Sequence, residues 1–257
     1  MSARKTRPAA AAKAGARGAK KAGADPAAAA KPGADPAATH YANGVVDDIM
    51  VVGVGGQGVI VAAAIIADTA LLHGGLEVKL SETRGMSQRG GSVSSHIRIG
   101  VTVIAPSISP GEVDYLLAFE SAEGLRLAPS VVADGSAIVN TQQIVPPLAA
   151  SSEHAYPYDA IDRLMECSRK KRDGGRGMHA SRACLTIVNG NALALQVGDL
   201  KVAGVVLVGA LSTHLPFAVE TWEQAIARNV PPSWLEMNLA AFAAGRRTGG
   251  IEGSDET

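Results

Sequence analysis

The stretch that decides the fold is Asp48-Ile-Met-Val-Val-Gly53-Val-Gly55-Gly56-Gln57-Gly58, an apolar run that passes directly into a glycine-rich turn. A short apolar run that ends in glycine is typical of a buried parallel strand. Residues 59–72 have the length and the Ala- and Ile-rich composition of a helix, and Gly74-Gly75 ends it. Residues 76–81 then alternate as a second strand does. The order strand, glycine turn, helix, strand predicts a Rossmann-like unit.

Strands and helices continue to alternate along the rest of the chain. We predict further strands at residues 113–119 and 137–140, with a short candidate at 97–99. Helices are expected at residues 121–128, 158–167, 192–197, 204–212, 219–227 and 233–244, the last ending at Gly245. This order predicts an α/β fold: a single Rossmann-like domain over residues 45–247, with a mainly parallel sheet and helices on both faces.

Charge and composition separate the two ends from the body. The 257 residues hold 24 Lys+Arg and 24 Asp+Glu, but eight of the basic side chains and only two acidic ones lie in residues 1–40, so the remainder is acidic. Residues 1–44 contain almost no large apolar side chains, which predicts a disordered tail, and residues 248–257 a flexible C-terminus. The tail is either a basic arm for nucleic acid or an acidic partner, or a solvated linker.

Several classes of protein are excluded by composition. Two cysteines cannot supply a disulfide framework, a four-Cys zinc site or the four thiolates of an iron–sulfur cluster. The six histidines show no metal-ligand spacing. No apolar run reaches the roughly 20 residues that span a bilayer, and the first residues lack the apolar stretch of a secretory signal. We therefore expect a cytoplasmic protein.

The glycine turn gives the first chemical signal. Gly53, Gly55 and Gly58 fit the pattern G-x-G-x-x-G between a strand and a helix, where a ligand can approach the backbone and the helix N-terminus favours an anion. A dinucleotide site also needs an acid near the end of the second strand, and Glu82 lies there. The turn alone indicates a protein that binds NAD or FAD, such as an NAD-dependent oxidoreductase, or a turn selected only for packing of helix on strand.

A second glycine-rich loop follows Glu82, where a dinucleotide fold would enter its next helix. It carries two arginines and three glycines, at Arg84, Arg89, Gly85, Gly90 and Gly91. The planar fork of arginine donates two parallel hydrogen bonds to a carboxylate or a phosphate. Because ligands of open α/β sheets bind beyond the carboxyl ends of the strands, two such loops favour a site or an interface over a loop of solvated arginines.

Together these motifs resemble the gamma-type domain of 2-oxoacid:ferredoxin oxidoreductases. The similar residues are Gly53-x-Gly55-Gly56-Gln57-Gly58, Ser81-Glu82-x-x-Gly85-x-x-x-Arg89-Gly90-Gly91, His96-x-Arg98, Trp222-Glu223-x-Ala225-Ile226 and Glu236-x-Asn238-x-x-Ala241-Phe242-x-x-Gly245. The resemblance covers about residues 46–247. With Val230-Pro231-Pro232 before the last helix, it is greatest to the indolepyruvate branch of the family.

The resemblance implies oxidative decarboxylation of a 2-oxo acid, an aryl pyruvate in that branch, with coenzyme A as co-substrate. The products are an acyl-CoA, carbon dioxide and reduced ferredoxin. The chain has no Gly-Asp-Gly followed by the Asn that would hold magnesium diphosphate, and too few cysteines for a cluster. We therefore expect thiamine diphosphate, Mg²⁺ and [4Fe–4S] clusters on a larger alpha subunit, and no catalytic residue or metal site in this chain.

Within such a complex, residues 55–58 and 84–91 would face the thiamine site of the partner. Arg84 and Arg89 would contact the substrate carboxylate or a phosphate of CoA, while Gln57 and Glu82 would fix the loops by hydrogen bonds. The basic segment at residues 169–182 lies outside the family pattern and is either a site for CoA or ferredoxin or a solvated insertion. A free-standing NAD-dependent enzyme and a binding module with a basic arm stay open as alternatives, although the acidic body disfavours nucleic acid.

Overall fold

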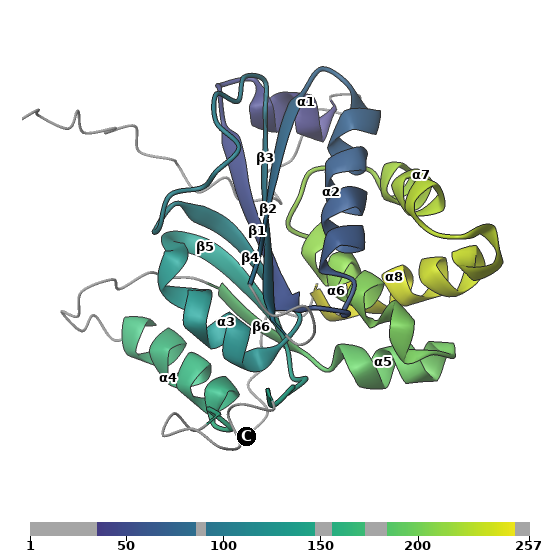
Figure 1. Ribbon diagram of the computed structural model, residues 1–257. Coiled ribbons are helices and arrows are strands. Elements are labelled where there is room, and N and C mark those ends of the chain that lie inside the picture. The colour runs from purple at the N-terminus through teal and green to yellow at the C-terminus, as the bar shows by residue number, and fades with distance from the viewer. Residues whose placement is uncertain (1–34, 86–90, 147–155, 173–183, 250–257) are drawn as a thin grey trace, which may run out of the picture.

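One six-stranded sheet divides the computed structural model into two helical layers (Figure 1). The structure describes residues 35–85, 91–146, 156–172 and 184–249. The strand order is β2-β3-β1-β4-β5-β6. The strands are β1 (Val46–Val54), β2 (Glu77–Arg84), β3 (Ser92–Gly100), β4 (Val113–Ala118), β5 (Val131–Asn140) and β6 (Cys184–Val188). β1, β4, β5 and β6 are mutually parallel, whereas β3 runs antiparallel between β1 and β2.

Helices cover both faces of this sheet, as Figure 1 shows. On one face lie α2 (Val59–His73), α5 (Gly190–Val197), α6 (Ala203–Ser212), α7 (Val219–Asn229) and α8 (Leu235–Gly249). On the other lie α3 (Ser121–Leu127) and α4 (Ala160–Arg172). Single 3₁₀ turns occur at Ala128–Ser130, Leu200–Val202 and Pro232–Trp234. The predicted α/β class, with a mainly parallel sheet between two helical layers, is confirmed.

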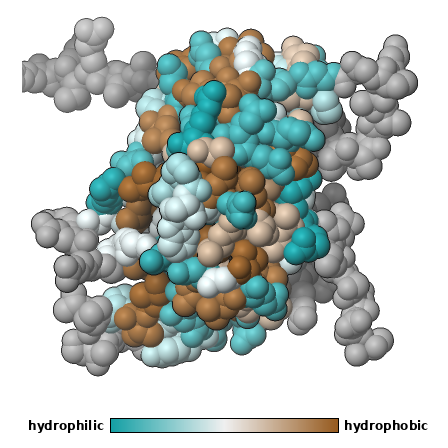
Figure 2. Space-filling view, turned by 90° about the vertical axis from the view of Figure 1, so that its right-hand side faces the viewer, coloured by the Kyte–Doolittle hydropathy of each residue, from teal (hydrophilic) through white to brown (hydrophobic). Residues whose placement is uncertain are grey.

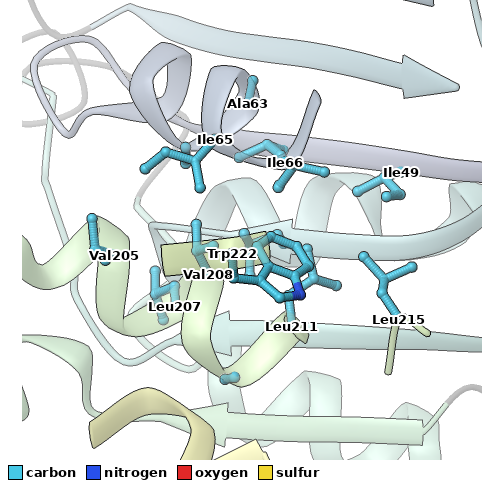
Figure 3. Packing of buried hydrophobic residues seen from close by; sticks show 14 of the residues in the cluster. Ile49, Ala63, Ile65, Ile66, Val205, Leu207, Val208, Leu211, Leu215 and Trp222 are labelled. Atoms are coloured by element: carbon cyan, nitrogen blue, oxygen red, sulfur yellow. The ribbon is translucent and has the colours of Figure 1, made fainter. Parts of the chain in front are cut away.

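The central strand is buried on both faces because the two helical layers meet across it. Ile49 and Val51 of β1 belong to the larger apolar cluster, under α2 and α6, while Met50 and Val52 belong to the smaller one on the side of α3. In the larger cluster the fully buried ring of Trp222, from α7, lies among aliphatic side chains of α2, α6 and β1 (Figure 3). Burial on both sides explains why β1 is a continuous apolar run.

Three strands differ from the prediction. β5 begins at Val131, six residues before the start of the strand predicted at 137–140. The expected piece at residues 97–99 is part of the nine-residue β3, whose side chains alternate between buried and half-buried. One face of β3 carries polar residues, among them Ser94 and His96, so the strand contains no continuous apolar run from which it could have been predicted in full. β6 was not predicted, because it has only five residues and follows the polar segment at 169–182.

The N-terminal boundary of the folded part also differs. Helix α1 (Pro36–Tyr41) lies inside the predicted tail of residues 1–44, with Ala37 and Tyr41 almost completely buried. The Tyr41 hydroxyl donates a hydrogen bond of 2.6 Å to the buried carboxylate of Asp47. Two apolar contacts and one buried hydrogen bond therefore order a stretch whose composition indicates disorder. The rest of the predicted tail, residues 1–34, lies outside the described residues.

The last helix continues past its predicted end. α8 runs to Gly249, and Gly245, the predicted stop, lies inside it. A Cβ atom at Gly245 would lie 1.8 Å from the carbonyl oxygen of Val206 in α6. The glycine is there because two helix backbones touch, not because the helix ends. None of the described helices is long and apolar enough to cross a membrane.

Candidate functional site

The glycine turn joins the carboxyl end of β1 to the first turn of α2. Gly56 and Gly58 have φ angles of 101° and 85°, a region that L side chains rarely adopt. Gly53 is needed for a different reason, since a Cβ atom there would lie 2.7 Å from the side-chain oxygen of Gln57 and 2.8 Å from Cβ of Phe119. The turn therefore needs glycine both for its backbone and for what packs against it.

Gln57 folds back over this turn and joins three strand ends. Its side-chain oxygen accepts a hydrogen bond from the amide of Val54, at 2.6 Å. Its amide nitrogen donates to the carbonyl of Phe119 at 3.0 Å and to the side-chain oxygen of Gln142 at 2.8 Å. Phe119 follows β4 and Gln142 follows β5. The carboxamide therefore lies at the point where the chain leaves β1 toward one face of the sheet, into α2, and leaves β4 toward the other face, into α3. Ligands of open α/β sheets bind at that point, and here a side chain of the protein occupies it.

The second loop meets the first at its base. The amide of Gly55 donates to the carbonyl oxygen of Gly91 at 2.9 Å, and the amide of Gly85 donates to that of Ser92 at 2.8 Å. The structure therefore brings Gly55 and Gly91, from the two sequence motifs, into direct contact. Arg89 and Gly90 lie outside the described residues.

Glu82 and Arg84 lie on β2, away from the turn. They pair with each other through Nη2 of Arg84 and Oε2 of Glu82 at 3.1 Å, and the arginine side chain is 63% exposed. Glu82 lies opposite Ser95 of β3, which in turn lies opposite Val51 of β1. An entire strand thus separates the acid from the glycine turn, about 10 Å at the usual strand spacing. The arrangement lacks the adjacent acidic residue of a dinucleotide site.

His96 and Arg98, from the third similar motif, hold a loop against the sheet. The guanidinium of Arg98 donates to both carboxylate oxygens of the buried Asp48, at 2.7 and 3.0 Å. Nδ1 of His96 accepts a hydrogen bond from the amide of Ile108 at 3.2 Å, and burial lowers the pKa of the ring. These contacts indicate that both residues support the fold.

Two polar residues at the same edge, Asn140 and Glu120, were not predicted from the sequence. Asn140, at the end of β5, donates to the carbonyl of Phe119 at 3.1 Å and accepts from the amide of Gly190 at 3.0 Å. The buried carboxylate of Glu120 accepts hydrogen bonds from backbone and side chain. Both residues stand at the end of a predicted strand, and this position was the signal that could have identified them.

The surroundings of the turn are open and partly apolar. Gly55, Gly56 and Gly58 are exposed, and the first turn of α2 exposes 37% of Ile60 and 42% of Val61. Apolar patches also appear among polar ones on the outer surface of the helical layer that contains α2 (Figure 2). Among the described residues no three His, Cys, Asp or Glu side chains gather as a metal site requires, and Cys167 and Cys184 are free and exposed. Two cysteines cannot supply the four thiolates of an iron–sulfur cluster.

Comparison with known proteins adds a family to this geometry. Residues 48–248 match the family "Pyruvate ferredoxin/flavodoxin oxidoreductase". Over 200 residues the chain is 36% identical to an indolepyruvate oxidoreductase subunit IorB of Archaeoglobus fulgidus, covering 77% of this chain and 92% of the relative. It is 27% identical over 208 residues to a 2-oxoglutarate synthase subunit KorC of Methanothermobacter marburgensis, covering 77% and 94%. Among solved structures, the gamma subunit of a keto/oxoacid ferredoxin oxidoreductase from Geobacter sulfurreducens is similar in fold, with a TM-score of 0.58 at 23% identity over 79% of this chain and 98% of that one.

Proposed function

Because the chain belongs to the pyruvate ferredoxin/flavodoxin oxidoreductase family, we propose that it is the accessory subunit of a complex that oxidises an aryl pyruvate such as indolepyruvate. The observation that carries the proposal is the match to IorB, at 36% identity over 92% of that subunit. The lower identity to KorC, at 27% over a similar length, favours an aryl pyruvate over 2-oxoglutarate. The expected reaction yields an acyl-CoA, carbon dioxide and reduced ferredoxin.

The chemistry of the reaction belongs to a larger alpha subunit in this proposal. The chain has only two cysteines and no Gly-Asp-Gly followed by the Asn that would hold magnesium diphosphate, which supports placing thiamine diphosphate, Mg²⁺ and the [4Fe–4S] clusters on that partner. The open glycine turn, with exposed Ile60 and Val61 beside it, is the surface that would complete the partner's site. Ferredoxin, the 2-oxo acid and CoA are the further partners of the assembled enzyme.

Arg89 is the side chain that we expect to reach the ligand. It stands two residues before Gly91 in the sequence, and the carbonyl of Gly91 accepts a hydrogen bond from the amide of Gly55. In this proposal the guanidinium of Arg89 donates to the substrate carboxylate or to a phosphate of CoA. Arg84 has the same chemistry, but its ion pair with Glu82 engages it already, so a smaller role is expected.

The test is to isolate the chain, tagged, from its own cells and to examine it by native mass spectrometry, iron analysis and turnover. We expect a larger, brown, iron-containing partner in fixed ratio. Ferredoxin reduction should require both CoA and a 2-oxo acid, and should be faster with indolepyruvate than with 2-oxoglutarate. In that complex Arg89→Ala should lower the rate about tenfold or more, the effect of losing one charge-assisted hydrogen bond, without lowering the thermal midpoint of the subunit.

Arg247→Ala is the matched control, because it removes an exposed arginine from α8 and should leave turnover unchanged. An unchanged rate in Arg89→Ala would remove that residue from the site, and lost assembly would assign it to the subunit contact instead. A colourless homo-oligomer that binds NAD would contradict the whole proposal and restore the dinucleotide interpretation of the turn. The register of β2 and β3, which separates Glu82 from the turn, argues against that result.

A further inference from the structure

Glu120 is a buried carboxylate at the carboxyl end of β4 to which the proposed function assigns no role. Its side chain is satisfied by three donors although the residue is only 1% exposed. The amide of Glu123 donates to Oε2 at 2.8 Å, and the amide of Ile144 donates to Oε1 at 3.2 Å. The hydroxyl of Tyr156 also donates to Oε1. Burial and the hydrogen bond to Glu120 raise the pKa of Tyr156 to about 12, so it remains a donor.

One set of contacts leads from this carboxylate to the second glycine loop. Glu120 caps the first turn of α3, in which Glu123 lies. Oε2 of Glu123 accepts a hydrogen bond from the hydroxyl of Ser92 at 2.6 Å, and Arg126 donates to the same hydroxyl at 3.0 Å. Ser92 directly follows Gly91, so the anchored first turn of α3 fixes the base of the loop.

A second set of contacts leads to the first glycine turn. Ile144, the donor to Glu120, belongs to the segment that follows β5. In the same segment the carbonyl oxygen of Gln142 accepts from the amide of Ser121 at 2.9 Å. The side chain of Gln142 accepts from Gln57 at 2.8 Å. Both sets of contacts therefore start at Glu120. The first ends at the second glycine loop and the second ends at the first glycine turn, and these two segments meet where the amide of Gly55 donates to the carbonyl of Gly91.

We propose that Glu120 is a positioning residue that sets Gly91, at the base of the second glycine loop, relative to the first glycine turn by anchoring α3 and the segment after β5. Its effect on turnover rests on the proposed function, whereas its effect on the loops does not. A carboxylate is required because both of its oxygens accept from backbone amides, which cannot turn away. In Glu120→Gln one of those oxygens becomes an NH₂ group that faces a donor, and the cap of α3 or the contact with Ile144 is lost.

The direct readout is the hydrogen-exchange rate of the Gly55 amide in the full chain, measured by NMR. In Glu120→Gln we expect this rate to rise about tenfold, the effect of weakening one hydrogen bond. Ser92→Ala is a second variant that keeps Glu120 and removes the contacts of the Ser92 hydroxyl with Glu123 and Arg126, and it should raise the same rate. This variant removes a half-buried hydroxyl, so folding should survive even if Glu120→Gln does not fold.

Tyr156→Phe is the matched control. It removes the third donor to the same carboxylate but leaves the amides of Glu123 and Ile144 bound to it. It should destabilise the protein yet change Gly55 exchange less than twofold. If Gly55 exchange is unchanged in Glu120→Gln and Ser92→Ala, or rises equally in Tyr156→Phe, then the residue only stabilises the fold and the proposal is overturned.

Kinetics of the assembled complex separate this proposal from the proposed function. If the loops face the ligand, Glu120→Gln should raise KM for CoA or the 2-oxo acid several-fold while kcat changes less than twofold. If Gly55 exchange rises and both constants stay the same, the positioning of the loops stands and the placement of the loops at the partner's site is contradicted.

Discussion

At the residue scale, the carboxamide of Gln57 makes more contacts than any other side chain of the glycine turn, and its removal gives the first prediction. Gln57→Ala leaves the amide of Val54 without this partner, while the carbonyl of Phe119 keeps its hydrogen bond from Asn140. Each buried polar group that loses its partner costs about 1–3 kcal/mol. We expect the free energy of unfolding, measured with urea, to fall by about 2 kcal/mol.

Gln143→Ala is the control for this prediction. Gln143 is exposed, and its side chain makes one hydrogen bond, to the carbonyl of Tyr158 at 2.9 Å. Exposed substitutions of this kind change stability by about 0.5 kcal/mol or less. Equal losses in the two variants would show that Gln57 does not hold the turn as its contacts indicate.

A second residue-scale prediction concerns pH. Burial lowers the pKa of His96 below its usual 6.5, and Nδ1 must be unprotonated to accept from the amide of Ile108. Below the pKa of the unfolded state, the unfolded chain therefore binds more protons at this site than the folded one. Stability from this group is complete above about pH 7 and is lost as the pH falls through 6.5 toward the folded pKa.

The measurement is urea unfolding of the wild type and His96→Gln between pH 7.5 and 5.0. The variant should lose less stability over this range, because it has no proton to take up at that position. His214, whose pKa burial also lowers, contributes equally to both proteins. This contribution cancels in the difference between the curves, and parallel curves would contradict the prediction.

The residue scale also shows the limit of sequence reasoning about the site. The place of the turn between a strand and a helix could be predicted, because glycine spacing and an apolar run are local signals. The partners of Gln57 could not, because Phe119 and Gln142 lie 62 and 85 residues away. Glu82 follows the local dinucleotide pattern equally well, yet β3 separates it from the turn.

At the element scale, the contact of α6 with α8 depends on glycine. A Cβ atom at Gly245 would lie 1.8 Å from the carbonyl oxygen of Val206. Helix propensity alone favours Gly245→Ala by about 1 kcal/mol. A clash with backbone cannot be relieved by a rotamer change, and overpacking of this kind costs about 1–3 kcal/mol or more. An approach of 1.8 Å to backbone calls for the upper end of this cost, so we expect Gly245→Ala to lower the free energy of unfolding by about 2 kcal/mol after the gain in propensity.

Ala243→Ser tests the same helix at an exposed position and should change stability by about 0.5 kcal/mol or less. Urea unfolding of both variants gives the comparison. A stabilised Gly245→Ala protein would mean that propensity outweighs the contact and that the two helices can separate at little cost.

Element prediction succeeded where the apolar pattern is strong and failed where another signal overrides it. Helix α2 was expected at residues 59–72 and ends at His73, because Gly74 stops it. The predicted end of α8 was wrong. In the sequence, a glycine that is required by contact with a neighbouring helix cannot be distinguished from a glycine that ends a helix. β3 was expected in part only, since one of its faces is polar.

At the scale of the whole molecule, the extent of the folded unit gives the last prediction. Deleting residues 1–34 keeps α1, whereas deleting residues 1–42 removes it together with the buried side chain of Tyr41. The second deletion also takes away the hydroxyl that donates to Asp47, a carboxylate only 3% exposed.

Loss of a buried aromatic side chain costs about 3–5 kcal/mol, and the carboxylate of Asp47 loses a donor in addition. We therefore expect the protein without residues 1–42 to unfold at a urea concentration well below that of the full chain. If residues 1–34 are the tail that their composition predicts, the free energy of unfolding of the protein without them should lie within about 1 kcal/mol of that of the full chain. Tyr41→Ala in the full-length protein separates the side chain from the deletion, because it should reproduce most of the loss while residues 1–40 stay in place. Equal stability of the two truncated proteins would return the boundary to residue 45, where composition alone puts it.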